Sequence, residues 1–133
     1  MLRAVLLAIS LFVPAVSQAD EKIKCNPSGT QIEMNECAVE DFAKAEKELN
    51  QTYQSLLKKE ANNPLFISKL RLAQRAWLAF RDAELEARFS CAERDVKLCW
   101  GSMFPMLLYS RKAEITRERT KQFKQIMKEG IGQ

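Results

Sequence analysis

The chain has 133 residues and no histidine, with 21 Lys and Arg against 17 Asp and Glu. The lack of His excludes the common Ser-His and Cys-His nucleophile pairs and zinc sites that use imidazole. A net charge of +4 is too small to indicate a polyanionic partner by itself. The charge is uneven, because residues 20–62 carry a net charge of −3 and residues 63–133 one of +6.

The first 19 residues have the pattern of a cleavable signal peptide. Arg3 precedes an apolar run over residues 4–16, and the small residues Ser17 and Ala19 follow. The run is shorter than the roughly 20 residues needed to span a bilayer. We therefore expect cleavage after Ala19, export to the periplasm and no stable membrane anchor. Residues 20–133 then form a single domain with one modest core.

A first helix is predicted to begin after Thr30. Thr30 and Glu33 have the spacing of a capping box, in which each side chain accepts a hydrogen bond from the backbone amide of the other. The apolar pattern then repeats every three or four residues and ends at residues 62–64. Its members are Ala38, Phe42, Ala45, Leu49, Tyr53 and Leu56.

A second helix is predicted to begin with Asn63 as its N-cap and Pro64 in its first position, and to run to about Cys91. Alanines beside its apolar stripe would permit close contact with another helix. The stripe consists of Phe66, Leu70, Ala73, Trp77 and Phe80, and the flank of Leu72, Ala76, Ala79 and Ala83.

A third helix is predicted to begin near Ser102 or Pro105, after the pattern breaks between Cys91 and Gly101. Its apolar positions are Leu108, Ile115, Phe123 and Ile126. Nothing in the sequence predicts a strand. The expected fold is all-α, a small three-helix antiparallel bundle with two disulfides.

Four cysteines lie in the segment expected to be exported, at Cys25, Cys37, Cys91 and Cys99. An even number of Cys in an oxidising compartment indicates two disulfides. Zinc is the less favoured alternative, because the intervals of eleven and seven residues do not match the usual spacing of zinc ligands. We expect no metal or other cofactor. Three pairings are possible, and we favour the two local ones.

The segment RAWLAFRDAE, residues 75–84, mixes aromatic and charged side chains. The stripe places Trp77 and Phe80 in the core, whereas a nucleic-acid site would need exposed aromatic rings. Arg81 follows Trp77 by four residues, so its stem can cover the indole and its guanidinium can reach a carboxylate on the first or third helix. Asp82 faces another direction. We predict structural roles for these residues and no nucleic-acid partner.

Clustered carboxylates are the remaining catalytic possibility. Glu33, Glu36, Glu40 and Asp41 lie close together on the first helix, and two of them could in principle act as acid and base. However, acidic residues are expected in a first helical turn, and no apolar pocket is indicated around them. We therefore expect that the protein is not an enzyme.

Two stretches, TQIEMNECA and AQRAWLAFRDAE, resemble the lysozyme inhibitor LprI-like family. The resemblance implies a small exported helical domain and, for some members, inhibition of lysozyme. It supports the pairing of Cys25 with Cys37. Similar members often carry cysteines where this chain has Leu85 and Arg111, so the second disulfide is a departure. The likeness continues through LNQTYQSLL, GSMFPM and ITRERT, at residues 49–57, 101–106 and 115–120.

Two functions from different classes follow. The first is a periplasmic binding protein that blocks a c-type lysozyme by occluding its active-site cleft. Because such lysozymes are basic, the binding edge is expected to comprise Glu33, Glu36 and Glu40 beside a loop held by the Cys25–Cys37 disulfide. The alternative is an envelope interaction or scaffold module without inhibitory activity, bound through the basic segment 111–128.

Overall fold

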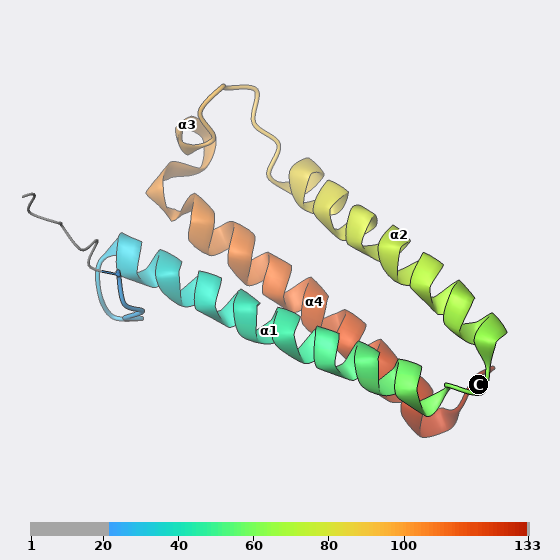
Figure 1. Cartoon of the computed structure of the whole chain (residues 1–133). Helices are drawn as coiled ribbons and strands as arrows, with labels where there is room; N and C mark the ends of the chain where they lie inside the picture. Colours follow the sequence, from blue (N-terminus) through green and yellow to red (C-terminus); the bar gives the residue numbers. More distant parts are fainter. Residues whose placement is uncertain (1–21, 133) are drawn as a thin grey trace, which may run out of the picture.

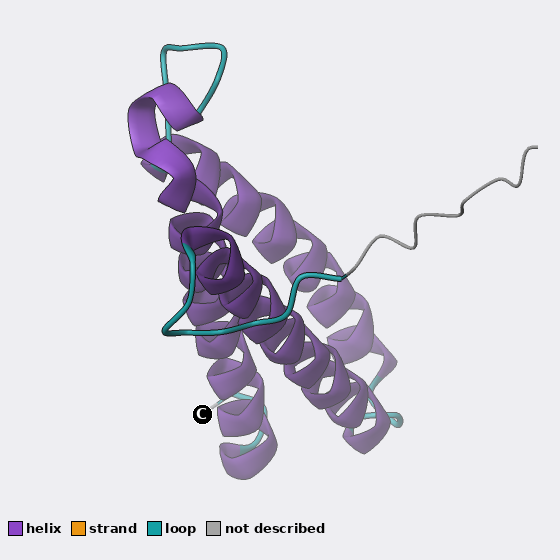
Figure 2. Cartoon of the chain, turned by 90° about the vertical axis from the view of Figure 1, so that its left-hand side faces the viewer, coloured by secondary structure: helices purple, strands orange, loops and turns teal. Residues whose placement is uncertain are grey.

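The computed structural model describes residues 22–132, which form helices and loops without any strand (Figures 1 and 2). The three long helices are α1 (Gln31–Lys59), α2 (Pro64–Arg88) and α4 (Phe104–Glu129). A short helix α3 (Lys97–Trp100) and a 3-10 turn η1 (Gly101–Met103) join α2 to α4. The predicted all-α fold is confirmed. The predicted signal peptide lies outside the described residues. Within those residues, no helix is long and apolar enough to cross a membrane.

The predicted helix starts are confirmed. At α1, Thr30 Oγ1 accepts from the Glu33 amide at 3.4 Å, and Glu33 Oε2 accepts from the Thr30 amide at 2.7 Å. At α2, Asn63 Oδ1 accepts from the Phe66 amide at 3.0 Å, and Pro64 occupies the first turn. These bonds satisfy amides that have no partner inside their own helix. The helix α2 ends at Arg88, slightly before the predicted Cys91.

The helices α1 and α4 pack against each other along their length, whereas α2 lies farther away on one side (Figure 1). Small buried residues permit the close approach of α1 and α4. The hydroxyls of Thr116 and Thr120 donate to carbonyls one turn earlier in α4, at 2.8 and 3.1 Å, so they are buried without an unmet donor. The small buried residues are Ala38, Ala45, Thr52, Ala113, Thr116 and Thr120.

The main apolar core lies toward the end of the molecule where α1 turns into α2. Its buried members are Leu49 and Leu56 of α1, Leu70 of α2 and Phe123 of α4. Trp77 is partly buried and packs against this cluster, as its place in the predicted stripe required. Leu70, Phe66 and Trp77 of α2 therefore join a core that α1 and α4 also supply.

The prediction that Phe80 belongs to the core is wrong, because this side chain is 60% exposed. The buried face of α2 is centred on Leu70, Gln74, Arg81 and Leu85. Each residue turns a helix by about 100°, which puts Trp77 at the margin of that face and Phe80 beyond it. Apolar periodicity misplaced the face because two of its central residues are polar. The flanking alanines predicted to permit helix contact, Ala76, Ala79 and Ala83, also face solvent, and so does Ala73, which was predicted in the buried stripe.

Candidate functional site

The loop before α1 is tied to the second turn of that helix by a disulfide. Cys25 and Cys37 are bonded, with their Cα atoms 4.5 Å apart, which confirms the predicted pair. Between them the chain turns tightly, since the Gly29 amide donates to the Asn26 carbonyl at 3.1 Å. A Cβ at Gly29 would collide with the Glu33 carboxylate and lie 2.7 Å from Asn26 Nδ2. Only glycine fits this turn without displacing its neighbours.

We call residues 25–29 together with Glu33, Glu36 and Glu40 the acidic edge. The three glutamates share one face of α1, because they are spaced by three and four residues. Glu33 is committed to the fold: hydrogen bonds from the amide and then the hydroxyl of Thr30 lower the pKa of its carboxyl. Glu36 and Glu40 are partly exposed and form no ion pair within residues 22–132. Their charges are available to a partner.

Other carboxylates of α1 are neutralised by basic side chains. Lys124 of α4 donates to Glu48 at 2.6 Å, and this hydrogen bond and the lysine charge lower the pKa of Glu48. Arg117 of α4 pairs in the same way with Asp41. The tertiary structure thus pairs Asp41 and Glu48 with α4 and Glu46 with Arg81 of α2, and leaves the acids of the acidic edge without an ion pair.

The acidic edge is anchored at its base. Asn35 Nδ2 donates to the Ser102 carbonyl of η1 at 3.0 Å, and Gln31 Nε2 donates to Asn35 Oδ1 at 2.9 Å. The first bond joins the start of α1 to η1, and the second holds the Asn35 side chain in place. A cavity of about 270 Å³ lies beside the disulfide, lined by Pro27, Met34, Cys37, Ala38, Asp41, Met106 and Ser110.

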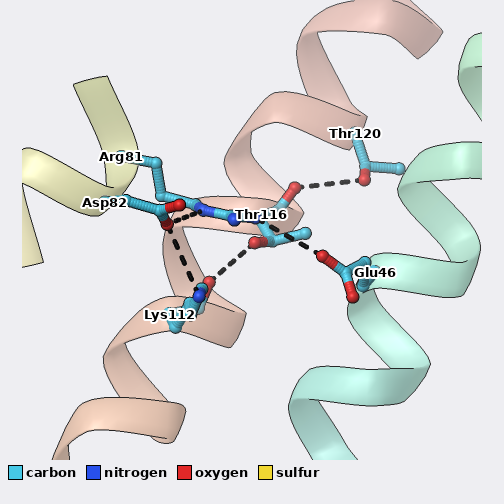
Figure 3. Close-up of polar contacts among 6 residues, drawn as sticks. All are labelled: Glu46, Arg81, Asp82, Lys112, Thr116 and Thr120. Atoms are coloured by element: carbon cyan, nitrogen blue, oxygen red, sulfur yellow. Dashed lines mark hydrogen bonds and ion pairs between the residues drawn. The ribbon is translucent and has the colours of Figure 1, made fainter. Parts of the chain in front are cut away.

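Arg81 forms a buried polar cluster that joins α2 to the other two helices (Figure 3). The residue is 4% exposed, and its guanidinium carbon lies 5.4 Å from the ring centre of Trp77 and 5.7 Å from that of Phe42. Nη1 lies 3.7 Å from Glu46 Oε1 on α1. The predicted reach of Arg81 over the indole and toward a carboxylate of the first helix is confirmed.

Asp82 completes this cluster instead of facing away from it as predicted. The carboxylate accepts from Arg81 Nε at 2.9 Å and lies 3.4 Å from Lys112 Nζ of α4 (Figure 3). Desolvation would raise the pKa of Asp82, but the hydrogen bonds and charges of Arg81 and Lys112 outweigh it and lower this pKa. Arg81 and Asp82 therefore link α2 to α1 and α4.

The Cys91–Cys99 pair, also predicted, closes a loop that stands out from the helices (Figure 2). Trp100 Nε1 donates to the Phe89 carbonyl at 3.2 Å, and the Phe89 ring lies 5.3 Å from Trp100 and 6.0 Å from Phe104. The sequence predicted no role for these aromatic residues, because the segment between Cys91 and Gly101 shows only a break in the helical pattern. The aromatic residues on both sides of the cysteine pair were the available signal.

A hollow of about 600 Å³ lies between this loop and the facing ends of α2 and α4. Apolar side chains dominate its wall, including Leu85, Phe89 and Phe104, with Asp82 and Lys112 also in the lining. These two charged residues already pair with each other in the Arg81 cluster. Among residues 22–132, no group of three or more Cys, Asp or Glu side chains is arranged to hold a metal ion.

Comparison with known proteins matches residues 23–123 to the family described as lysozyme inhibitor LprI. The chain is also 32% identical over 141 aligned positions to the uncharacterized protein R02472 of Rhizobium meliloti (strain 1021). That alignment covers 95% of this chain and 96% of the relative. No solved structure matches the chain.

Proposed function

We propose, on the premise that this chain belongs to the lysozyme inhibitor LprI family, that it is a periplasmic protein that inhibits a c-type lysozyme by occluding the active-site cleft. The observation that carries the proposal is the family match over residues 23–123, which contains the whole acidic edge. Inhibition by occlusion requires shape and charge complementarity but no catalytic group.

The acidic edge is the surface that best fits such a partner. It is restrained by the Cys25–Cys37 disulfide, the capping box and the bonds to η1. A restrained surface loses less conformational entropy when it binds. Because c-type lysozymes are basic, the unpaired carboxylates of Glu36 and Glu40 would attract one over a distance and raise the association rate.

The lysozyme cleft itself contains two catalytic carboxyl groups, so a segment that enters it must bring a hydrogen-bond donor. Lys24 is exposed one residue before the disulfide. We assign Lys24 to the cleft and Glu36 and Glu40 to the basic surface around it. This division explains how an acidic edge can approach an acidic catalytic centre.

The alternative, an envelope scaffold bound through residues 111–128, has less support from the charges of α4. Several basic side chains of this segment are paired with acids of the same protein: Arg111 with Glu84 and Glu114, Lys112 with Asp82, Arg117 with Asp41, Lys121 with Glu118 and Lys124 with Glu48. These pairs reduce the positive charge that α4 can offer to an anionic lipid surface.

A lysis assay with c-type, g-type and i-type lysozymes on cell-wall substrate tests the proposal. We expect the purified protein to slow lysis by the c-type enzyme. No inhibition of any class at saturating protein would reject lysozyme inhibition. Binding to anionic vesicles that falls steeply with salt, in the absence of inhibition, would instead support the alternative.

Charge reversal locates the surface. Glu36→Lys with Glu40→Lys should slow association with a c-type lysozyme by about tenfold or more at low salt. The matched control reverses Lys121 and Lys128, which are exposed on α4. Lys124 is unsuitable as a control because it pairs with Glu48 of α1. If only the control pair slows association, the contact lies on α4 and the acidic edge is the wrong assignment.

A further inference from the structure

The side of α2 that points away from α1 and α4 carries a regular line of exposed residues. They recur at intervals of three, four, three, four and three positions, which is the heptad spacing of a helix-pairing surface. We call this line the α2 seam, and it consists of Lys69, Leu72, Ala76, Ala79, Ala83 and Glu86. Figure 1 shows α1 and α4 together on the opposite side of α2.

The composition of the α2 seam suits close contact with another helix. Three of its four inner positions are alanines, which let two helix backbones approach closely. Leu72 in the seam is 53% exposed, and Phe80 beside it is 60% exposed. An exposed apolar patch of this kind marks an interaction surface more often than isolated apolar residues do.

The seam is complementary to itself when two copies run antiparallel. Its intervals read the same in both directions, so a two-fold axis between positions 77 and 78 aligns the two seams. Ala76 then faces Ala79 of the second copy, and Leu72 faces the second copy's Ala83. In the same register, Lys69 at one end meets Glu86 at the other.

Charge also favours the antiparallel over the parallel direction. The first half of α2 carries Lys69, Arg71 and Arg75 and no acid, whereas the second half carries all three acids of the helix, Asp82, Glu84 and Glu86, with Arg81 and Arg88, a net charge of −1. Lys69 and Glu86 make no ion pair within the described part of this chain. An antiparallel pair brings opposite charges together, and a parallel pair would bring like charges together.

We propose that the α2 seam binds a second copy of this chain, giving a two-fold symmetric dimer of antiparallel α2 helices. Symmetric dimers of this type use the same patch on both subunits. This association is separate from lysozyme inhibition and leaves the acidic edge on α1 uncovered.

Sedimentation equilibrium of the purified, disulfide-bonded protein over a range of concentrations tests the dimer. We expect the mass to rise with concentration toward twice the monomer mass. Ala76→Glu buries an unpaired charge at the centre of the seam and should raise the dissociation constant by about 100-fold or more. The matched control, Ala43→Glu, changes an exposed helical alanine of α1 and should leave the dissociation constant unchanged. Circular dichroism verifies that both variants fold.

A charge exchange tests the register. Lys69→Glu and Glu86→Lys should each weaken the dimer, and the double variant should restore it, because each exchanged acid again faces an exchanged base in the second copy. A protein that stays monomeric at its highest attainable concentration overturns the proposal. A dimer that Ala76→Glu leaves intact also overturns it, and a double variant as weak as the single ones rejects the antiparallel register.

Discussion

The α1–α4 pair and α2 are held in place by different kinds of contact. Small residues bring α1 and α4 together over their length, and salt bridges such as Arg117–Asp41 link them. The helix α2 is attached through Leu70, Trp77 and a buried arginine. Two amphipathic helices therefore make one tight interface, while a third helix that is no less apolar leaves one apolar side exposed. Apolar content alone does not decide which side of a helix is buried.

The largest effect is expected in the α1–α4 pair. Phe123 is fully buried, and its ring centre lies 5.6 Å from that of Tyr53. Phe123→Ala removes this packing and should lower the free energy of unfolding by about 3–5 kcal/mol. Guanidinium unfolding followed by circular dichroism measures the change. A loss below about 1 kcal/mol, on the order of a surface substitution, would show that α1 and α4 do not carry the core.

An intermediate effect is expected where α2 is attached. Arg81→Gln removes the charge that bonds Asp82 and lies beside Glu46. The expected loss of stability is about 1.5–3 kcal/mol, the range for hydrogen bonds to charged groups. Amide exchange should then accelerate in α2 more than in α1 and α4, because α2 loses the side chain that joins it to them. Equal acceleration in all three helices would contradict the distinct attachment of α2.

A smaller effect is expected from protonation of the same cluster. The folded protein has a lowered pKa at Asp82, so this carboxylate contributes stability above its unfolded pKa near 3.8. That contribution is lost as the pH falls below this value and through the lowered folded pKa. It should be below about 1 kcal/mol, since the side chain is half-exposed. Melting temperatures measured from about pH 6 to about pH 2 should fall less in Asp82→Asn than in the unchanged protein.

The smallest effect on monomer stability is expected on the outer side of α2. Phe80→Ala should change the free energy of unfolding by less than about 0.5 kcal/mol, because Phe80 is 60% exposed. Unfolding should be measured at protein concentrations where the protein is monomeric. A loss of unfolding free energy as large as that of Phe123→Ala would show that Phe80 belongs to the core, as the apolar periodicity had predicted.

Local sequence signals determined the helices and both disulfides. The capping box at Thr30 and Glu33 and the Asn63–Pro64 start depend only on residues a few positions apart. The cysteine pairs are likewise close in sequence, at separations of 12 and 8 residues. These features depend on residues that are near each other in the chain, which is why the sequence predicts them well.

The resemblance to the LprI family was also readable from short motifs, and it directed attention to the acidic face of α1. The sequence could not show which acids of that helix stay unpaired. Asp41 and Glu48 are neutralised by residues 76 positions away in sequence. The sequence by itself therefore indicated an acidic edge, but its charge depends on the register of α1 against α4.

The orientation of α2 was decided only by the tertiary structure. Both sides of this helix carry apolar residues, and the buried one has Gln74 and Arg81 near its centre. A polar residue can be buried when other elements supply partners for it: Glu46 of α1 lies near Arg81, and Arg119 of α4 donates to Gln74. Periodicity within one helix contains no information about such partners. The sequence thus determined where each helix begins and which cysteines pair, and the contacts between helices decided which side of α2 faces solvent.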